Sequence, residues 1–118
     1  TAIAIGGVNN STTLLNGGVA QNIVAVAGLD IDCSAGNFFV KTINANSTFT
    51  FSNAPASRVF AFTLELTHTS GTVTWPATVR WSTNTAPTLT TNKTHLFMFV
   101  TDDGGTRWRG AALVDYDT

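Results

Sequence analysis

The stretch from Val59 to Thr69 constrains the fold more than any other part of the chain, because its side chains repeat with a period of two. One set of alternate positions is large and apolar and ends in a histidine: Phe60, Phe62, Leu64, Leu66 and His68. The positions between them are smaller or polar: Val59, Ala61, Thr63, Glu65 and Thr67. Successive side chains of a strand point to opposite faces, whereas a helical face repeats about every 3.6 residues. The pattern therefore predicts a strand with one core face and one wetter face.

Short strand signals follow this stretch, separated by turns and prolines. Residues 69–71 predict a glycine-containing turn, after which residues 72–75 return as the second strand of a hairpin. Pro76 ends that strand because proline has no amide hydrogen to donate. A short loop follows, then residues 79–81 and a polar run at residues 82–86. Residues 87–90 predict a short edge strand, where a leading proline is tolerated.

Residues 93–101 look the most buried part of the chain, with an unbroken apolar run from Leu96 to Val100. A strand covered on one face would alternate, so this run predicts a central strand covered on both faces, with Phe97 and Phe99 in the core. The pair Asp102 and Asp103, followed by two glycines, predicts a hairpin turn from which residues 106–114 pair back. Together these elements predict an all-β fold, a single antiparallel β-sandwich.

The amino-terminal section differs from the rest of the chain in composition. Residues 1–18 are rich in glycine, asparagine, serine and threonine, with scattered apolar side chains and no periodicity. We expect them to form an extended arm that becomes ordered when a neighbour covers it. The length of 118 residues fits a single domain, which we expect at residues 19–118. Its first strand is expected at residues 23–26.

Charge is sparse in this chain. Charged residues make up 11% of the sequence, against about 25% in ordinary soluble domains. Interface cores are depleted in charge, so this composition favours an oligomer whose faces are shared. Six basic and seven acidic residues leave no basic footprint for nucleic acid, and no apolar run has the length of a membrane span. The single cysteine, Cys33, excludes an intrachain disulfide and is expected to be a buried small apolar residue.

Several segments resemble a β-rich module of phage virion surface proteins, of the tail-fibre, appendage or capsid-decoration type found in marine and cyanobacterial phages. The similar segments are residues 29–34, 36–39, 48–51, 67–76, 79–81, 86–90, 93–105 and 108–110, and the likeness covers about residues 19–116. Residues 80–84 depart from the pattern, because relatives tend to have a proline and glycines after the tryptophan. The resemblance implies a jelly-roll-like sandwich, a homotrimer, other virion proteins as partners and assembly in the host bacterial cytoplasm.

No arrangement typical of catalysis is visible, neither a serine triad order nor a phosphate loop nor a cysteine cluster. We therefore predict no catalytic residue, no cofactor and no metal. His68 and His95 fall on two predicted core strands, where a metal site would need Cys33 or Asp102 as further ligands. The alternative, which we favour, is that each histidine ends an apolar face and hydrogen-bonds to the backbone.

Two pairs of carboxylates raise the alternatives of a glycosidase site or a calcium site. Asp30 and Asp32 lie two residues apart on one predicted strand and are expected to face solvent or another subunit. Asp102 and Asp103 are better explained by turn chemistry, since aspartate stabilises its own turn.

Aromatic and basic side chains give the remaining candidates. Trp75 and Trp81 flank a Trp-Pro corner and are expected in the core or an interface rather than on a sugar platform. Arg107 and Arg109 flank Trp108 and point to the opposite face from its ring, where they can pair with the turn carboxylates or a partner subunit. The predicted ligand or interface residues are Trp108, Arg107, Arg109, Asp102 and Asp103.

These observations predict a non-enzymatic phage virion structural protein that acts in particle assembly. The alternative is a carbohydrate-binding or host-receptor-binding adhesin module, with a host surface glycan as partner. A fragment of a hydrolase is the third and least favoured interpretation.

Overall fold

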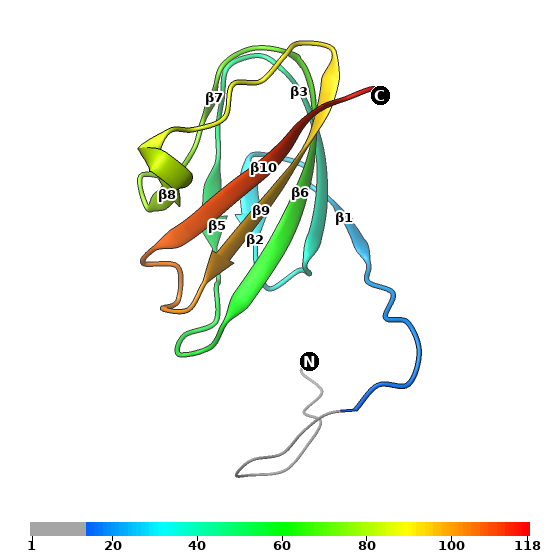
Figure 1. Cartoon of the computed structure of the whole chain (residues 1–118), viewed down its shortest axis with the longest axis vertical. Coiled ribbons are helices and arrows are strands. Elements are labelled where there is room, and N and C mark those ends of the chain that lie inside the picture. Colours follow the sequence, from blue (N-terminus) through cyan, green and yellow to red (C-terminus); the bar gives the residue numbers. More distant parts are fainter. Residues whose placement is uncertain (1–13) are drawn as a thin grey trace.

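The computed structural model describes residues 14–118, and almost all of their regular structure is strand (Figure 1). The elements are β1 (Ile23–Ala25), β2 (Asp30–Asp32), β3 (Phe38–Asn44), β4 (Ser47–Thr48), β5 (Thr50–Ser52), β6 (Phe60–Ser70), β7 (Val73–Thr74), β8 (Val79–Trp81), the short 3-10 turn η1 (Ser82–Asn84), β9 (Lys93–Thr101) and β10 (Trp108–Tyr116). The described residues contain no helix long and apolar enough to cross a membrane. The all-β prediction is confirmed.

The strands form one six-stranded sheet, in the order β1-β3-β6-β9-β10-β8, and two small pairs, β2-β5 and β4-β7. From β1 to β7 the chain leaves the large sheet and returns to it twice. Each return places the new strand parallel to the one before, so β3 lies beside β1 and β6 beside β3. The small pairs are parallel for the same reason. The antiparallel strands β9 and β10 then extend the sheet.

The prediction of an antiparallel sandwich is wrong in strand direction. Five of the seven strand pairings are parallel and two are antiparallel. A jelly roll is built from antiparallel strands, so these pairings do not describe one. Apolar periodicity tells which face of a strand is buried but not the direction of its neighbour. Parallel neighbours need a crossover connection, and here the crossovers run through the two small pairs.

The predicted hairpin across residues 69–71 is also absent from the structure. β6 is already paired on both edges, with β3 and with β9, so β7 has no free edge of β6 to join. The chain instead turns at Gly71 and places β7 beside β4. Residues 87–90, predicted as an edge strand, have no strand structure. The hairpin between β9 and β10 is confirmed, with Gly104 and Gly105 at positive φ.

At Gly71, where the chain passes from the large sheet to the β4-β7 pair, the neighbouring backbone leaves no room for a side chain. Its φ is +98°, and a Cβ atom there would lie 2.1 Å from the carbonyl carbon of Ala45. We predict that Gly71→Ala lowers the free energy of unfolding by about 1–3 kcal/mol, as overpacked sites do. Gly28→Ala is the matched control, because a Cβ at Gly28 meets nothing within 4 Å. Equal urea midpoints for the two variants would contradict this account of the turn.

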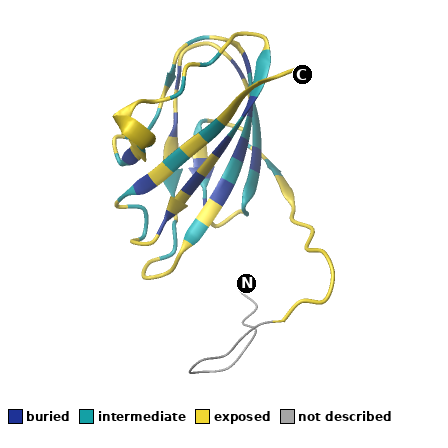
Figure 2. Ribbon diagram, viewed as in Figure 1, coloured by how far each residue is buried: buried dark blue, intermediate teal, exposed yellow. Residues whose placement is uncertain are grey.

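The core lies between the inner face of the large sheet and the two small pairs. Figure 2 shows the alternation of buried and exposed positions along the strands of the large sheet. The buried inner positions of β6 and β9 include Phe62, Leu64, Leu66, Phe97 and Phe99. From the opposite side, the ring of Phe51 lies 5.1 Å from Phe62 and 5.0 Å from Phe99. Trp75, just after β7, lies 4.5 Å from Phe97 and stacks on Phe49.

Phe62 tests this core directly, since its ring contacts Phe39, Phe51, Phe99 and Trp108. Truncation to alanine should lower the free energy of unfolding by about 3–5 kcal/mol in denaturant melts. Val59, in the loop before β6, is 74% exposed, so Val59→Ala should change stability by less than about 0.5 kcal/mol. A loss under about 1 kcal/mol for Phe62→Ala would mean that the register of β6 is wrong.

The predicted arm, residues 1–18, lies mostly outside the described residues. Its described part, residues 14–18, is exposed and forms no strand. The same is true of residues 19–22. The first strand, β1, begins at Ile23, close to the predicted position.

Candidate functional site

The outer face of the large sheet is a broad surface, and none of the described strands packs over it. Strand register arranges its outward-facing side chains in rows. One row is Ile23, Phe38, Thr63, Met98 and Ala111, and the next is Ala25, Val40, Glu65, Leu96 and Leu113. Within these two rows Glu65 is the one charged residue, and Leu113 and Ile23 are 53% and 71% exposed. Contiguous apolar patches of this kind mark interaction sites in soluble proteins.

β9 shows most clearly that this face lacks a cover. The sequence predicts a central strand buried on both faces, and β9 does lie between β6 and β10. Its inner side chains, His95, Phe97, Phe99 and Thr101, are buried. On the outer side, however, Met98 and Val100 are 37% and 39% exposed. The prediction that β9 is buried on both faces is therefore wrong within this chain. The outer side of β9 is nevertheless apolar, as the sequence indicated.

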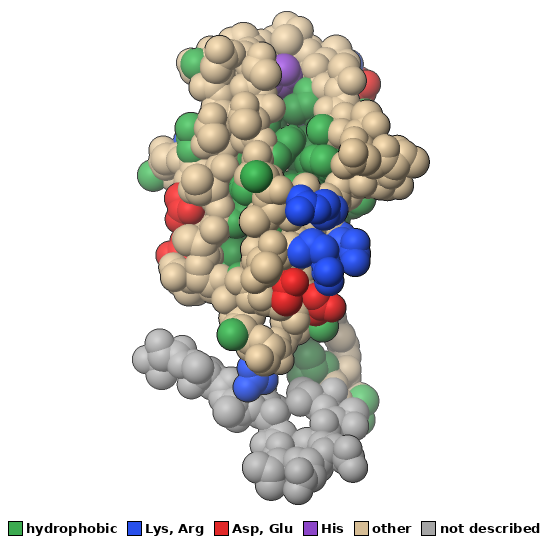
Figure 3. Space-filling model, turned by 90° about the vertical axis from the view of Figure 1, so that its left-hand side faces the viewer, with side chains coloured by type: hydrophobic (Ala, Val, Ile, Leu, Met, Phe, Trp, Pro, Cys, Tyr) green, Lys and Arg blue, Asp and Glu red, His purple; other side chains and the backbone are tan. Residues whose placement is uncertain are grey.

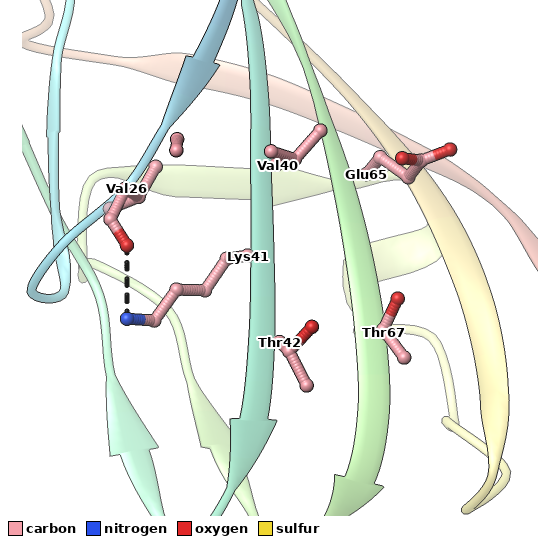
Figure 4. A pocket seen from close by; sticks show the side chains of 7 residues that line it. Val26, Val40, Lys41, Thr42, Glu65 and Thr67 are labelled. Carbon is pink, nitrogen blue, oxygen red and sulfur yellow. Dashed lines mark hydrogen bonds between the residues drawn. The ribbon is translucent and has the colours of Figure 1, made fainter.

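A shallow depression interrupts the outer face where β1 ends. Figure 4 shows its lining residues, with Val40 and Thr42 from β3 and Glu65 and Thr67 from β6. Lys41 does not form an ion pair with Glu65. It occupies an inward-facing position of β3 and turns toward the sheet edge, where Nζ donates to the carbonyls of Val26 and Ala27, each at 3.1 Å. Among residues 14–118, no ion pair involves Glu65.

The turn between β9 and β10 holds the predicted ligand residues. The Asp103 carboxylate accepts hydrogen bonds from the Thr101 hydroxyl at 2.9 Å and the Arg107 backbone at 3.0 Å. Asp103 is thus a turn residue, and the bond from Arg107 is the main reason that its pKa is lowered. Arg107 pairs with Asp102 at 3.3 Å, one of the two expected partners. Trp108 is only 2% exposed and faces the core, so its ring is not part of this surface.

The fifth predicted residue, Arg109, has a neighbour that the sequence did not indicate. β8 and β10 pair in parallel, and Arg109 is the register partner of Arg80. Both side chains are exposed, and within the described chain Arg109 has no ion pair or side-chain hydrogen bond. Figure 3 shows the resulting cluster of basic side chains next to acidic ones. Sequence patterns could not reveal this pair, because the parallel contact joins segments about thirty residues apart.

Asp30 and Asp32 are held in hydrogen bonds within the fold. Asp30 accepts from the hydroxyls of Thr50 and Ser52 at 2.7 and 2.6 Å, which joins β2 to β5. Asp32 accepts from Ser34 and from the Asn53 amide. The Ser34 hydroxyl, followed by Asn53, lowers the pKa of Asp32. These carboxylates therefore stabilise the contact between β2 and β5 and the adjacent turn. They are not arranged as a catalytic pair around a substrate.

The histidines follow the favoured alternative. His68 Nε2 donates to the Gly71 carbonyl at 2.6 Å, and its Nδ1 lies 3.3 Å from the Thr90 carbonyl. His95 Nε2 donates to the same Thr90 carbonyl at 3.1 Å, while its Nδ1 accepts from the Asp115 backbone. The predicted bonds to the backbone are confirmed.

Cys33 is buried, and the burial, aided by the nearby Asp32 and Asp30 charges, raises the pKa of its thiol to about 12. The thiol is therefore protonated at neutral pH and suited to packing rather than to nucleophilic chemistry. Within the described part of the chain, no three histidine, cysteine, aspartate or glutamate side chains form a group that could hold a metal ion.

Comparison with known protein families, with curated proteins and with solved structures gives no match. The resemblance to phage virion modules thus remains a hypothesis carried by the sequence motifs alone.

The lowered pKa values of Asp32 and Asp103 predict how stability depends on pH. A carboxyl group whose pKa is lower in the folded state stabilises that state above its unfolded pKa of about 3.9, and this contribution is lost as pH falls through the folded pKa. We expect melting temperature to fall between about pH 5 and pH 3. Ser34→Ala removes the largest cause at Asp32, so its melting temperature should depend less on pH across that window. Identical pH profiles for this variant and the parent chain would contradict the assignment.

Proposed function

We propose that this chain is a non-enzymatic structural module of a phage virion, assembled in the bacterial cytoplasm and displayed on the particle as a β-sandwich. The observation that carries the proposal is the uncovered, apolar outer face of the six-stranded sheet. The virion setting is supported by the sequence motifs described above. A binding role rather than catalysis is supported by Asp30, Asp32, His68 and His95, whose polar atoms are engaged in hydrogen bonds within the fold.

The two apolar rows form the centre of the proposed contact. Strands about 4.8 Å apart and rows about 7 Å apart give them an extent of roughly 20 Å across five strands and about 7 Å from one row to the next. A standard interface buries roughly 800 Å² on each partner, so the proposed contact extends beyond these rows over more of the outer face. The scarcity of charge on this face matches the composition of interface cores.

A second copy of this chain is the proposed occupant. A neighbouring copy would cover the apolar rows, in keeping with the small number of charged residues in the sequence. Soluble homo-oligomers close by rotational symmetry, and in the three copies that the resemblance favours each outer face would contact a different surface of the next copy. The exposed residues 14–22 lead away from β1 at the edge of the same sheet, so an amino-terminal arm is placed to reach a neighbouring subunit or another virion protein.

Leu113→Glu tests the outer face. Placing a carboxylate among the apolar rows should weaken self-association at least about tenfold, because a buried charge without a partner is strongly unfavourable. Sedimentation of the parent chain at micromolar concentration should show an oligomer, and the variant should move toward a monomer that still unfolds cooperatively. Val59→Glu is the matched control, since Val59 is exposed but lies outside the face. A parent chain that is monomeric throughout this range would refute the proposal.

Deletion of residues 1–18 tests the arm separately. The shortened chain should keep its cooperative unfolding, because the described core lies entirely beyond residue 18. It should fail to incorporate into particles when competed against the full chain. Equal incorporation of the two forms would remove the arm from the proposed mechanism.

A role in binding host glycans is the second candidate. The observation that favours it is the exposed pair Arg80 and Arg109 at the opposite edge of the sheet from β1.

A further inference from the structure

We propose that Arg80 and Arg109, with the η1 turn beside them, form a binding site for the oxyanion group of an acidic glycan. The group would be a sugar carboxylate or a sulfate ester, which share the chemistry that a guanidinium recognises. The site gives the second candidate function a ligand class, and it does not rest on self-association through the outer face.

The first argument is the placement of like charges. Register partners on neighbouring strands are about 5 Å apart, and two like charges in that position destabilise a sheet. Arg80 and Arg109 occupy such positions on β8 and β10. Arg107 lies two residues before Arg109, so three of the six basic residues of the chain lie at or next to this strand pair. Of these three arginines, only Arg107 has a carboxylate partner among the described residues.

The second argument is that the pair is partly fixed in place. Arg80 Nη1 donates to the Ala77 carbonyl at 2.7 Å, which anchors one end of the guanidinium. Nη1 also lies 3.4 Å from the Val79 carbonyl, whereas Nη2 and Nε of Arg80 and the guanidinium of Arg109 have no hydrogen-bond partner among the described residues. Two planar guanidinium groups side by side present donors to both oxygens of a carboxylate or to two oxygens of a sulfate. An oxyanion would also relieve the repulsion between the two arginines.

The third argument is the strain in η1, which follows Arg80 and Trp81 directly. Thr83 and Asn84 have φ values of 56° and 57°. A β-branched residue such as Thr83 is rarely found in this left-handed region, and strain of this kind gathers at binding sites. None of the η1 side chains is buried, so core packing does not account for the conformation. The exposed side chains of η1 are polar, namely Ser82, Thr83 and Asn84, and they follow Arg80 closely along the chain, where the Ser82 hydroxyl and the Asn84 amide suit the hydroxyls of a sugar.

The surroundings favour a glycan over a nucleic acid. Asp102 and Asp103 lie in the turn that precedes Arg107, so the positive region is small and bounded by negative charge. A phosphate backbone is held by an extended basic surface, and this chain has a net charge of −1. A polymer whose acidic groups are spaced apart and separated by neutral hydroxyls matches a small site of this kind.

Calorimetric titration of the intact chain at low salt tests the inference with four probes: polygalacturonate, dextran sulfate, neutral dextran and single-stranded DNA. We expect binding to polygalacturonate, to dextran sulfate or to both, and the comparison of the two identifies the oxyanion. Arg109→Gln and Arg80→Gln should each weaken binding about tenfold or more, as the loss of a charge-assisted contact does. Arg58→Gln is the matched control, because Arg58 is exposed and lies in the loop before β6. It should bind as the parent chain does.

Three results would overturn the inference: no binding to either acidic polymer, an equal loss in Arg58→Gln, or DNA binding as tight as glycan binding. Arg109→Lys keeps the charge without the planar fork, so an affinity between those of the parent and Arg109→Gln supports the site even if Arg80→Gln proves unstable. Sedimentation of the same samples separates this site from the proposed assembly face, since the arginine variants should keep the parent's oligomeric state.

Discussion

Pairing on both edges of β6 governs the rest of the structure. β3 lies along one edge in parallel and β9 along the other in antiparallel, while Leu64 and Leu66 on the inner face are fully buried. A strand that is paired twice offers no edge to the segment that follows it. The chain therefore leaves the sheet at Gly71, and β7 joins the covering layer beside β4. The same step occurs after β1 and β3, and so the parallel strands follow from repeated changes of layer.

Polar side chains in and around the core keep the layers in register. Asp30 joins β2 to β5 by accepting hydrogen bonds from two hydroxyls, while His68 donates to the Gly71 carbonyl and His95 donates to the Thr90 carbonyl. Buried side-chain nitrogen and oxygen atoms in the described residues all have hydrogen-bond partners. An unsatisfied buried polar group destabilises a fold, so these bonds are a condition of stability. They also engage the polar atoms of Asp30, His68 and His95 within the fold.

Two surfaces of different character share the large sheet. The apolar rows span β1, β3, β6, β9 and β10, and the paired arginines lie where β10 meets the edge strand β8. They adjoin at Arg109, whose register partner on the other side is the exposed Val100 of β9. One face suits burial against another copy of the chain, while the edge remains accessible to a charged ligand. The proposed assembly and the proposed glycan site are therefore compatible in one particle.

The sequence by itself determined the features that depend on near neighbours along the chain. The period of two in β6 gave its core face, the Asp-Gly turn gave the β9–β10 hairpin, and Asp103 stabilises that turn as its position indicated. Tertiary structure alone decided strand direction, the exposure of Met98 on the outer side of β9, and the meeting of Arg80 with Arg109. A local pattern records which side of a strand is buried and where the chain can turn. The partner of that strand depends on which edges distant segments have already filled, and no periodicity carries that information.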